Sequence, residues 1–582
     1  MAVLDSPEVE KLLTLLDEIA RWRPGRKGVY LDEQGALASI LADANHVVMG
    51  RRGSGKTRLL DELDRKLNKE KTWVVTVEAE ELKFLSFPDI LIQIIRRFLE
   101  AFSGLLDPSP EFLSKEWWLL QKQKIRHPLK FRRNRKRRLD LLSKTRSLLN
   151  VFCSLLDEAE ESQATYSVTA GTSTTTGSRT NAGVGSHGFN VGSEWYEGSE
   201  TGEVEQRERT QNETKSNKVE RLLGDFKSLL IQVCETTDRS VILAVDDFYF
   251  VRRADQPVVI DYMHRICKNT NAFLKIATIK HRTHLKAVRG GVVTGVTLGH
   301  EIQEINLELT LGQFWLITKF LEGIWAQACK SVGISDPKSL FRGDGFQQAV
   351  LASGGIPRDF FGVIKLALRV ARLRNEDAVG KLRINEAARQ YAEDTKLPEI
   401  NEDLDVDADL VKLLLYDISR FAKEVKKKNC FHVDLDQLAA DPEIQHLIDS
   451  LVDSRLIHLI SDDTTNSKRA GRRFAAYLVD VGLYGHPQRR GDRSIEEVEF
   501  WEKDNAGRLK NLERSPIYSL RTVEQLRGAV QATGIGEKDA RDILFDNPEP
   551  EEMEEEPNSQ RKSIARQIEI EFPPLPEHRI EE

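Results

Sequence analysis

A glycine-rich segment near the start of the chain carries residues suited to binding a polyphosphate. Residues 50–57 read GRRGSGKT and fit the pattern G-x-x-x-x-G-K-[ST] at every fixed position. In such a loop, backbone N–H groups point at phosphate oxygens, the lysine reaches the β- and γ-phosphates, and the final hydroxyl binds Mg²⁺. The sequence therefore predicts a nucleotide site whose cradle consists of Gly50, Gly53, Ser54, Gly55, Lys56, Thr57 and Arg58.

Two carboxylates follow a fully apolar run later in the chain. Residues 241–245 read VILAV, as expected of a buried parallel strand, and Asp246 and Asp247 come directly after them. We expect Asp246 to hold Mg²⁺ through water, together with Thr57, and Asp247 to orient or deprotonate an attacking water. Taken alone, an Asp pair at a strand end is only suggestive, because turns often carry Asp.

Two further segments place polar side chains where a γ-phosphate would be sensed. Residues 273–280 read as a third strand that ends in Thr278 and Lys280, with Arg282 just beyond. A solvated strand end explains these residues equally well. GGIPR at 354–358 makes a sharp entry to an apolar helix and puts Arg358 at its start. The predicted catalytic residues are Lys56, Asp247, Thr278, Lys280 and Arg358.

The elements around these residues predict an α/β fold with a parallel sheet of the P-loop NTPase type. Residues 46–49 form a short apolar strand before the glycine-rich loop, and leucines at helical spacing follow the loop. Residues 72–77 are predicted as the second strand and 88–99 as its helix.

The order of these motifs resembles that of the AAA+ superfamily, in the branch joining origin-recognition-like and STAND ATPases. The resemblance covers roughly residues 25–485. It implies ATP and Mg²⁺ as cofactors, a helical lid, and Arg358 as a second sensor in a segment that also matches the G-x-P turn of STAND members. Asp246-Asp247 departs from the Asp-Glu pair usual in AAA+ enzymes, so we expect a slow, switch-like ATPase.

The long interval between Lys56 and Asp246 predicts an inserted helical stalk. Residues 122–138 hold ten lysines and arginines, and residues 165–202 form a Ser/Thr/Gly-rich tip, predicted as a mobile loop or a thin hairpin. The basic run favours a sequence-independent nucleic-acid contact slightly over a solvated helix paired with nearby acidic residues. Its candidate residues are Arg132, Arg133, Arg135 and Arg137.

Residues 405–485 read as a winged helix. Helices are predicted at 410–421 and 444–452, and strands at 456–460 and 474–479. The basic wing tip could straddle a phosphate backbone, but the exposed side of the second helix is acidic. DNA binding through the wing and a rigid connector between domains therefore both remain open. The wing candidates are Lys468, Arg469, Arg472 and Arg473.

The C-terminal part of the chain contains two weaker signals. Residues 530–544 resemble half of a helix-hairpin-helix, although an ordinary helical packing unit is favoured. Residues 546–582 form an acidic tail predicted to be disordered. The predicted domains are the ATPase core at 1–102 and 217–300, the inserted stalk at 103–216, the lid at 301–400, the winged helix at 405–485, a helical region at 486–545 and the acidic tail.

The composition suits a multidomain cytoplasmic protein. The chain has 582 residues, a net charge of −7 and five scattered cysteines, with no apolar run long enough to span a bilayer. We therefore expect an ATPase that switches conformation or oligomeric state, a homo-oligomer that acts on DNA with a protein effector partner and without a membrane. Prokaryotic genome defence is one setting that the resemblance implies. The alternative is a non-hydrolysing, ATP-bound scaffold whose winged helix and stalk dock proteins.

Overall fold

The chain forms two compact units in a computed structural model. The model describes residues 3–20, 31–32, 35–67, 71–107, 136–157, 200–289, 291–402, 407–485, 495–501, 509, 511–533 and 544. The first unit, here the α/β unit, contains Gln34–Gly50 and Lys56–Asn306. The second, here the C-terminal unit, contains Met1–Glu33, Arg51–Gly55 and Leu307–Glu582.

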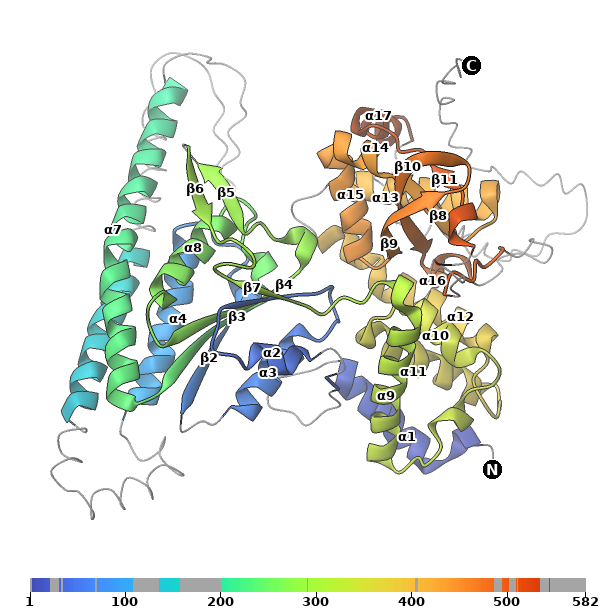
Figure 1. Cartoon of the computed structure of the whole chain (residues 1–582), viewed down its shortest axis with the longest axis horizontal. Coiled ribbons are helices and arrows are strands. Elements are labelled where there is room, and N and C mark those ends of the chain that lie inside the picture. The colour runs from blue at the N-terminus through green and yellow to red at the C-terminus, as the bar shows by residue number, and fades with distance from the viewer. Residues whose placement is uncertain are drawn as a thin grey trace, which may run out of the picture. The chain divides into compact units, whose positions relative to one another are not determined.

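Five parallel strands make up the sheet of the α/β unit (Figure 1). Their order is β2-β3-β4-β1-β7, and every neighbouring pair is parallel. The predicted α/β fold with a parallel sheet is thus confirmed. The strands are β1 (His46–Met49), β2 (Thr72–Glu78), β3 (Ser240–Asp246), β4 (Ala272–Thr278) and β7 (Gln303–Asn306).

The central strands are apolar on both faces, because helices cover the sheet. All four residues of β1 are buried, as are six of the seven in β3. Helix α3 (Lys56–Lys66) packs against β3 and β4, α4 (Asp89–Leu106) against β2, and α8 (Gln256–Cys267) against β4. The strands and the helix predicted at 72–77, 241–245 and 88–99 form where the sequence placed them.

A buried lysine ties β4 to the start of β1. Lys275 is fully buried, and its ammonium donates to the carbonyl oxygens of Ala42 at 2.8 Å and Ala44 at 2.7 Å. Its third contact, at 2.8 Å, is Nδ1 of His46. Burial lowers the pKa of Lys275 to about 7. Burial, and then the charge of Lys275, lower the pKa of His46 to about 4.

Beyond the end of α4, two helices fall wholly or partly within the described residues of 103–216, the range predicted as the stalk. They are the helix at 136–157 and α7 (Glu200–Thr237), which joins β3. Phe152 and Leu230 are fully buried in the same core as the sheet, and Lys144 donates to Gln232 at 2.7 Å. Arg132, Arg133, Arg135 and the Ser/Thr/Gly-rich tip up to residue 199 lie outside the described residues.

A two-stranded antiparallel hairpin separates β4 from β7. It consists of β5 (Lys286–Arg289) and β6 (Val292–Gly295), and β6 packs beside α8. The sequence reasoning did not predict this hairpin.

The C-terminal unit begins with a group of helices around one apolar core. Helix α1 (Pro7–Ala20) packs against α9 (Phe314–Val332) and α11 (Pro357–Leu373), and Asp17 of α1 pairs with Lys365 of α11 at 2.6 Å. Helices α10 (Gly345–Ala352) and α12 (Lys381–Tyr391) pack against α11. The predicted lid helix at 360–371 lies within α11.

A second core in this unit holds a four-stranded sheet and the helices that pack on it, among them α17 (Val523–Thr533). The sheet order is β11-β8-β10-β9, in which β9 and β10 pair as an antiparallel hairpin. Helices and strands form at the four predicted positions within residues 405–485; α14 and β8 are additional there, and β11 is additional beyond that range. The elements are α13 (Ala408–Arg420), β8 (Cys430–Asp434), α14 (Leu435–Ala440), α15 (Pro442–Asp453), β9 (Ile457–Asn466), β10 (Arg469–Val479) and β11 (Ile517–Tyr518).

The part of the chain that the structure describes has no helix long and apolar enough to cross a membrane. All five cysteines fall in this part, and none of them forms a disulfide.

Candidate nucleotide site

The glycine-rich loop connects β1 to α3 and is bent by two left-handed glycines. Gly53 has φ +85° and Gly55 has φ +100°, conformations that cost other residues about 1–2 kcal/mol. The N–H of Gly50 donates to the carbonyl of Thr278 at 3.2 Å, which fixes the start of the loop to β4. Helix α3 begins at Lys56, so the N-terminal end of its dipole lies at the loop.

The loop has polar atoms that a phosphate would satisfy. Lys56 is 5% exposed, and its Nζ donates to the carbonyl of Gly50 at 2.9 Å. The hydroxyl of Ser54 is buried and has no hydrogen-bond partner among the residues that the structure describes. A buried polar atom without a partner costs about 1–3 kcal/mol, so this hydroxyl favours a ligand with acceptor oxygens. The residues present therefore fit a nucleotide polyphosphate.

Asp246 lies beside the first turn of α3. It is 3% exposed, and burial together with the charge of Asp247 raises its pKa to about 6. A hydrogen bond with Thr57 and the charge of Lys56 act in the opposite direction. A hydroxyl and a carboxylate are oxygen ligands that suit Mg²⁺, which keeps several waters and binds phosphate oxygens as well. Thr57 and Asp246, the two predicted metal ligands, are thus together.

Asp247 follows in a strained conformation. Its φ is +51°, and its backbone N–H donates to Oδ1 of Asp246 at 2.9 Å. Glu78, at the end of β2, is opposite Asp246 in the register of the two strands. Burial and nearby carboxylates, Glu81 first and then Asp247, raise the pKa of Glu78. Sequence reasoning missed Glu78, although its place at the end of the second strand was a usable signal.

Thr278 is buried at the end of β4, beside the loop. Its hydroxyl lies 2.6 Å from the hydroxyl of Thr283, which itself donates to the carbonyl of Ile279. Because Thr283 uses its single proton there, Thr278 is the donor between the two. Lys280 is exposed in the following 3-10 helix (Lys280–Arg282).

Tyr249 is a second residue that the sequence did not reveal. It follows Asp247 in a short 3-10 helix (Phe248–Phe250), with Lys56 Nζ 6.0 Å from the centroid of its ring. The guanidinium carbon of Arg282 lies 5.9 Å from the same centroid. The aromatic ring thus brings the loop lysine and Arg282 to one place, by contacts worth about 0.5–2 kcal/mol each.

Arg358 lies against the glycine-rich loop. A Cβ added to Gly53 would stand 2.9 Å from Cβ and 3.0 Å from Nε of Arg358, so only glycine fits at this point of the loop. Arg358 is in the first turn of α11, where the sequence placed it. Its expected role as a sensor of the phosphates stays a prediction.

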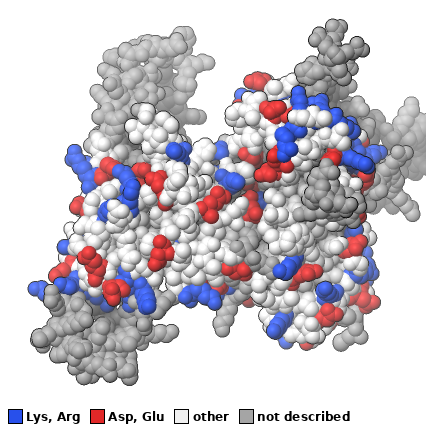
Figure 2. Space-filling model, viewed as in Figure 1, with Lys and Arg blue, Asp and Glu red and all other residues white. Residues whose placement is uncertain are grey.

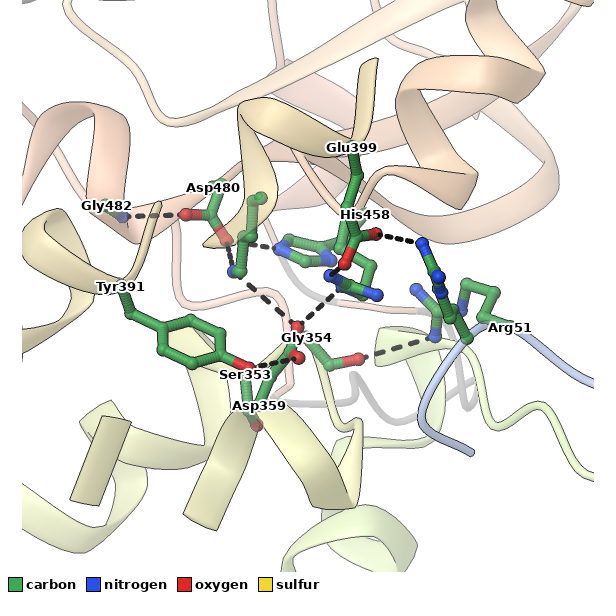
Figure 3. Close-up of polar contacts among 12 residues, drawn as sticks. Arg51, Ser353, Gly354, Asp359, Tyr391, Glu399, His458, Asp480 and Gly482 are labelled. Carbon is green, nitrogen blue, oxygen red and sulfur yellow. Dashed lines mark hydrogen bonds and ion pairs between the residues drawn. The ribbon is translucent and has the colours of Figure 1, made fainter. Parts of the chain in front are cut away.

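Arg51 and Arg52, which are part of the C-terminal unit, take part in a buried polar network there, in which Figure 3 labels Arg51. Arg51 Nη2 donates to the carbonyl of Gly354 at 3.4 Å, and Arg52 pairs with Glu399 at 3.6 Å. These arginines occupy variable positions of the loop pattern, and for that reason the sequence assigned them no role.

Arg455 connects Glu399 to α11. It is fully buried and pairs with Glu399 at 2.7 Å and with Asp359 at 2.9 Å. Burial alone would lower the pKa of Arg455, but the two carboxylates outweigh it and raise the pKa. Asp359 also accepts from the hydroxyl of Tyr391 at 3.1 Å.

A second buried group lies next to the first in Figure 3. Asp480 accepts from Lys396 at 2.5 Å and contacts Nε2 of His458 at 2.8 Å. Burial would raise the pKa of Asp480, but these two partners outweigh it and lower the pKa. A Cβ on Gly354 would stand 2.1 Å from Nδ1 of His458, so the turn before α11 lies directly on β9.

The predicted nucleic-acid residues that are described are exposed on two elements. Arg137 is exposed on the helix at 136–157. Arg472 pairs with the buried Asp434 at 2.8 Å, and Arg473 pairs with Asp463. Lys468 and Arg469 are exposed at the turn between β9 and β10. Figure 2 shows basic side chains gathered over the sheet that contains β8, β10 and β11.

No family model matches the chain, and no curated protein matches it either. Among solved structures, it is similar to a chain of the Drosophila ORC bound to DNA, with 12% identity, a TM-score of 0.32, and coverage of 82% of this chain and 90% of that one. The ORC2 protein of Aeropyrum pernix, in its ADPNP-ADP complexes, is 9% identical, with a TM-score of 0.34 and coverage of 81% and 94%. The Walker-type ATPase paby2304 of Pyrococcus abyssi is 12% identical, with a TM-score of 0.36 and coverage of 80% and 98%.

Proposed function

We propose that the chain binds ATP with Mg²⁺ and hydrolyses it slowly, as an ATPase of the AAA+/STAND type. The observation that carries the proposal is the convergence of Lys56, Thr57 and Asp246 at the carboxyl edge of a parallel sheet. Lys56 and the N–H groups of the loop would hold the phosphates, and Thr57 and Asp246 would hold Mg²⁺. Bound Mg²⁺ would supply charge stabilisation of the transferred phosphoryl group.

The expected rate is low because of the second carboxylate. Asp247 is one methylene shorter than the glutamate usual at its position, and its backbone is held by the bond from its N–H to Asp246. A general base must come within hydrogen-bond reach of the attacking water. A shorter side chain on a fixed backbone meets this condition less often, so hydrolysis is slow and the bound nucleotide acts as a switch.

The network around Arg455 supports a switch. The same loop that would bind phosphate also donates to Gly354 through Arg51 and pairs with Glu399 through Arg52. A phosphate in the loop would compete for these guanidinium groups. The competing charge would change the contacts of α11 and of the sheet that contains β9.

We further propose that the switched state acts on DNA as a homo-oligomer with a protein effector, in a setting such as genome defence. The exposed cations Lys468, Arg469, Arg472 and Arg473 and the exposed Arg137 support the contact with DNA. The winged-helix interpretation of residues 405–485 belongs to this proposal. It is supported by the helices α13 and α15 and the β9–β10 hairpin.

The test is phosphate release by the purified full chain with Lys56→Ala. We expect wild type to release phosphate slowly and the variant to lose at least about 90% of the rate, because an ammonium at the γ-phosphate stabilises the transition state by several kcal/mol. Lys66→Ala, at the exposed end of the same helix, is the matched control. Phosphate release that persists in Lys56→Ala would contradict the assignment of the nucleotide site to this loop. Tight binding of a fluorescent ATP analogue without any release would favour the scaffold.

A further inference from the structure

The β5–β6 hairpin exposes an unusual number of apolar groups. Val288 is 70% exposed, Val292 is 66% and Val293 is 55%. Val288 and Val293 are partners in the strand register, so they lie on one face, and Val292 lies on the other. Figure 1 shows the end of the hairpin extending beyond α8. Isolated two-stranded hairpins are marginally stable, so apolar groups exposed on both faces indicate a surface that meets a partner.

The chain around the hairpin carries only one sign of charge. The hairpin and its flanking residues, 280–300, contain four lysines and arginines and no aspartate or glutamate, in a protein whose net charge is −7. Lys280 and Lys286 are exposed, as is His284. The partner that complements this segment is therefore anionic.

We propose that the β5–β6 hairpin enters the major groove of double-stranded DNA. That groove admits a two-stranded β-ribbon, and it displays the thymine methyl group, a partner for exposed apolar side chains. Lys286, at the start of the hairpin, would neutralise a backbone phosphate. Stacking on single strands relies mainly on large aromatic side chains, and residues 280–300 contain no Phe, Tyr or Trp. The duplex is thus the nucleic acid that this surface fits.

The root of the hairpin is fixed to the candidate nucleotide site. Thr283 bonds to Thr278 at 2.6 Å, and Gln256 of α8 holds the carbonyl of Arg282 at 3.0 Å and the N–H of His284 at 2.7 Å. Thr278 in turn binds the loop through its carbonyl. A displacement of the hairpin on binding would therefore be transmitted through these hydrogen bonds to the end of β4, where the γ-phosphate is expected. This inference rests on the proposed ATPase function: binding of duplex DNA to the hairpin raises the rate of ATP hydrolysis.

The first experiment measures duplex binding by fluorescence anisotropy over a range of salt concentrations. The variant Val288→Thr/Val292→Thr/Val293→Thr keeps β-branched shapes, so the hairpin is retained, and Val425→Thr, at a valine 59% exposed elsewhere, is the control. We expect roughly fivefold weaker binding by the triple variant to a thymine duplex, and a much smaller loss on a uracil duplex that lacks the methyl groups. For Lys286→Gln, the slope of log affinity against log salt should fall by about 1, as for one lost phosphate contact.

Unchanged binding by the triple variant would overturn the proposal, and so would an equal loss on thymine and uracil duplexes. A change of oligomeric state without a change of DNA affinity would assign the hairpin to contact with a second copy instead. The second experiment compares ATP hydrolysis with and without duplex. The triple variant should keep the basal rate and lose the stimulation. The binding experiment does not need hydrolysis, so failure of the ATPase proposal and failure of the hairpin proposal are distinguishable.

Discussion

Asp246 is the buried carboxyl group of the candidate site, and its protonation state would affect binding of the proposed Mg²⁺. Burial and the adjacent Asp247 raise its pKa to about 6, well above the usual range of a carboxyl group. A carboxylate that must leave water to be buried is destabilised in its charged form, and a divalent cation restores the balance. An ionised Asp246 is therefore costly in the protein without a metal ion, and bound Mg²⁺ would offset that cost.

We therefore expect the Mg²⁺-dependent part of ATP binding to weaken as the pH falls through about 6. The sign follows from the raised pKa, because below it Asp246 carries a proton that Mg²⁺ must displace, at a cost of about tenfold in affinity per pH unit. Titration of a fluorescent ATP analogue from pH 5 to 8, with and without Mg²⁺, measures the effect. Asp246→Asn should show weak Mg²⁺ dependence at every pH. A wild-type profile that is flat through pH 6 would contradict the assignment.

At the scale of elements, the turn before α11 contacts β9 through its backbone rather than through a side chain. Gly354, at φ +57°, presses its backbone on His458 of β9. Gly343 has a similar φ of +53°, but no atom of the described part of the chain lies within 4 Å of an added Cβ. Alanine substitutions at these two glycines therefore separate the cost of backbone strain from the cost of overpacking the contact between the turn and β9.

Gly354→Ala should lower the free energy of unfolding by about 3 kcal/mol or more, because backbone strain of 1–2 kcal/mol adds to an overpacked contact. Gly343→Ala should lose only about 1 kcal/mol, the strain alone. Urea unfolding followed by tryptophan fluorescence and by far-UV circular dichroism measures both. Equal losses in the two variants would mean that the turn can move away from β9 at no cost.

The same scale shows what the sequence could and could not predict. The loop, the acidic strand end and the start of α11 were predictable, because each is a local pattern of residue types with a fixed spacing. Tyr249 was missed because the contact of its ring with Lys56 arises only in the folded chain. The end of the second strand could have pointed to Glu78, but its position opposite Asp246 depends on the register of β2 on β3. Arg455 was also missed, since its partners Asp359 and Glu399 are distant in sequence.

For the whole molecule, the proposed switch predicts a response to nucleotide that can be seen in solution. ATP with Mg²⁺ should shift the elution volume or the scattering profile of the wild-type chain, because phosphate would compete for Arg51 and Arg52. Lys56→Ala should show no shift, and Lys66→Ala should behave as wild type. Size-exclusion chromatography with light scattering makes the comparison. Identical profiles with and without nucleotide would leave a binding protein that does not switch.

The buried lysine between β1 and β4 has a consequence for how the sheet opens. Burial lowers the pKa of Lys275 to about 7, so its amine loses the proton, and becomes nucleophilic, at a lower pH than an exposed lysine does, although the side chain is fully shielded from water. An acylating reagent can modify it only during moments when β4 separates from the segment around Ala42 and Ala44. The labelling rate of Lys275, measured by mass spectrometry, would therefore report how often β4 separates from the segment that precedes β1, the strand before the glycine-rich loop.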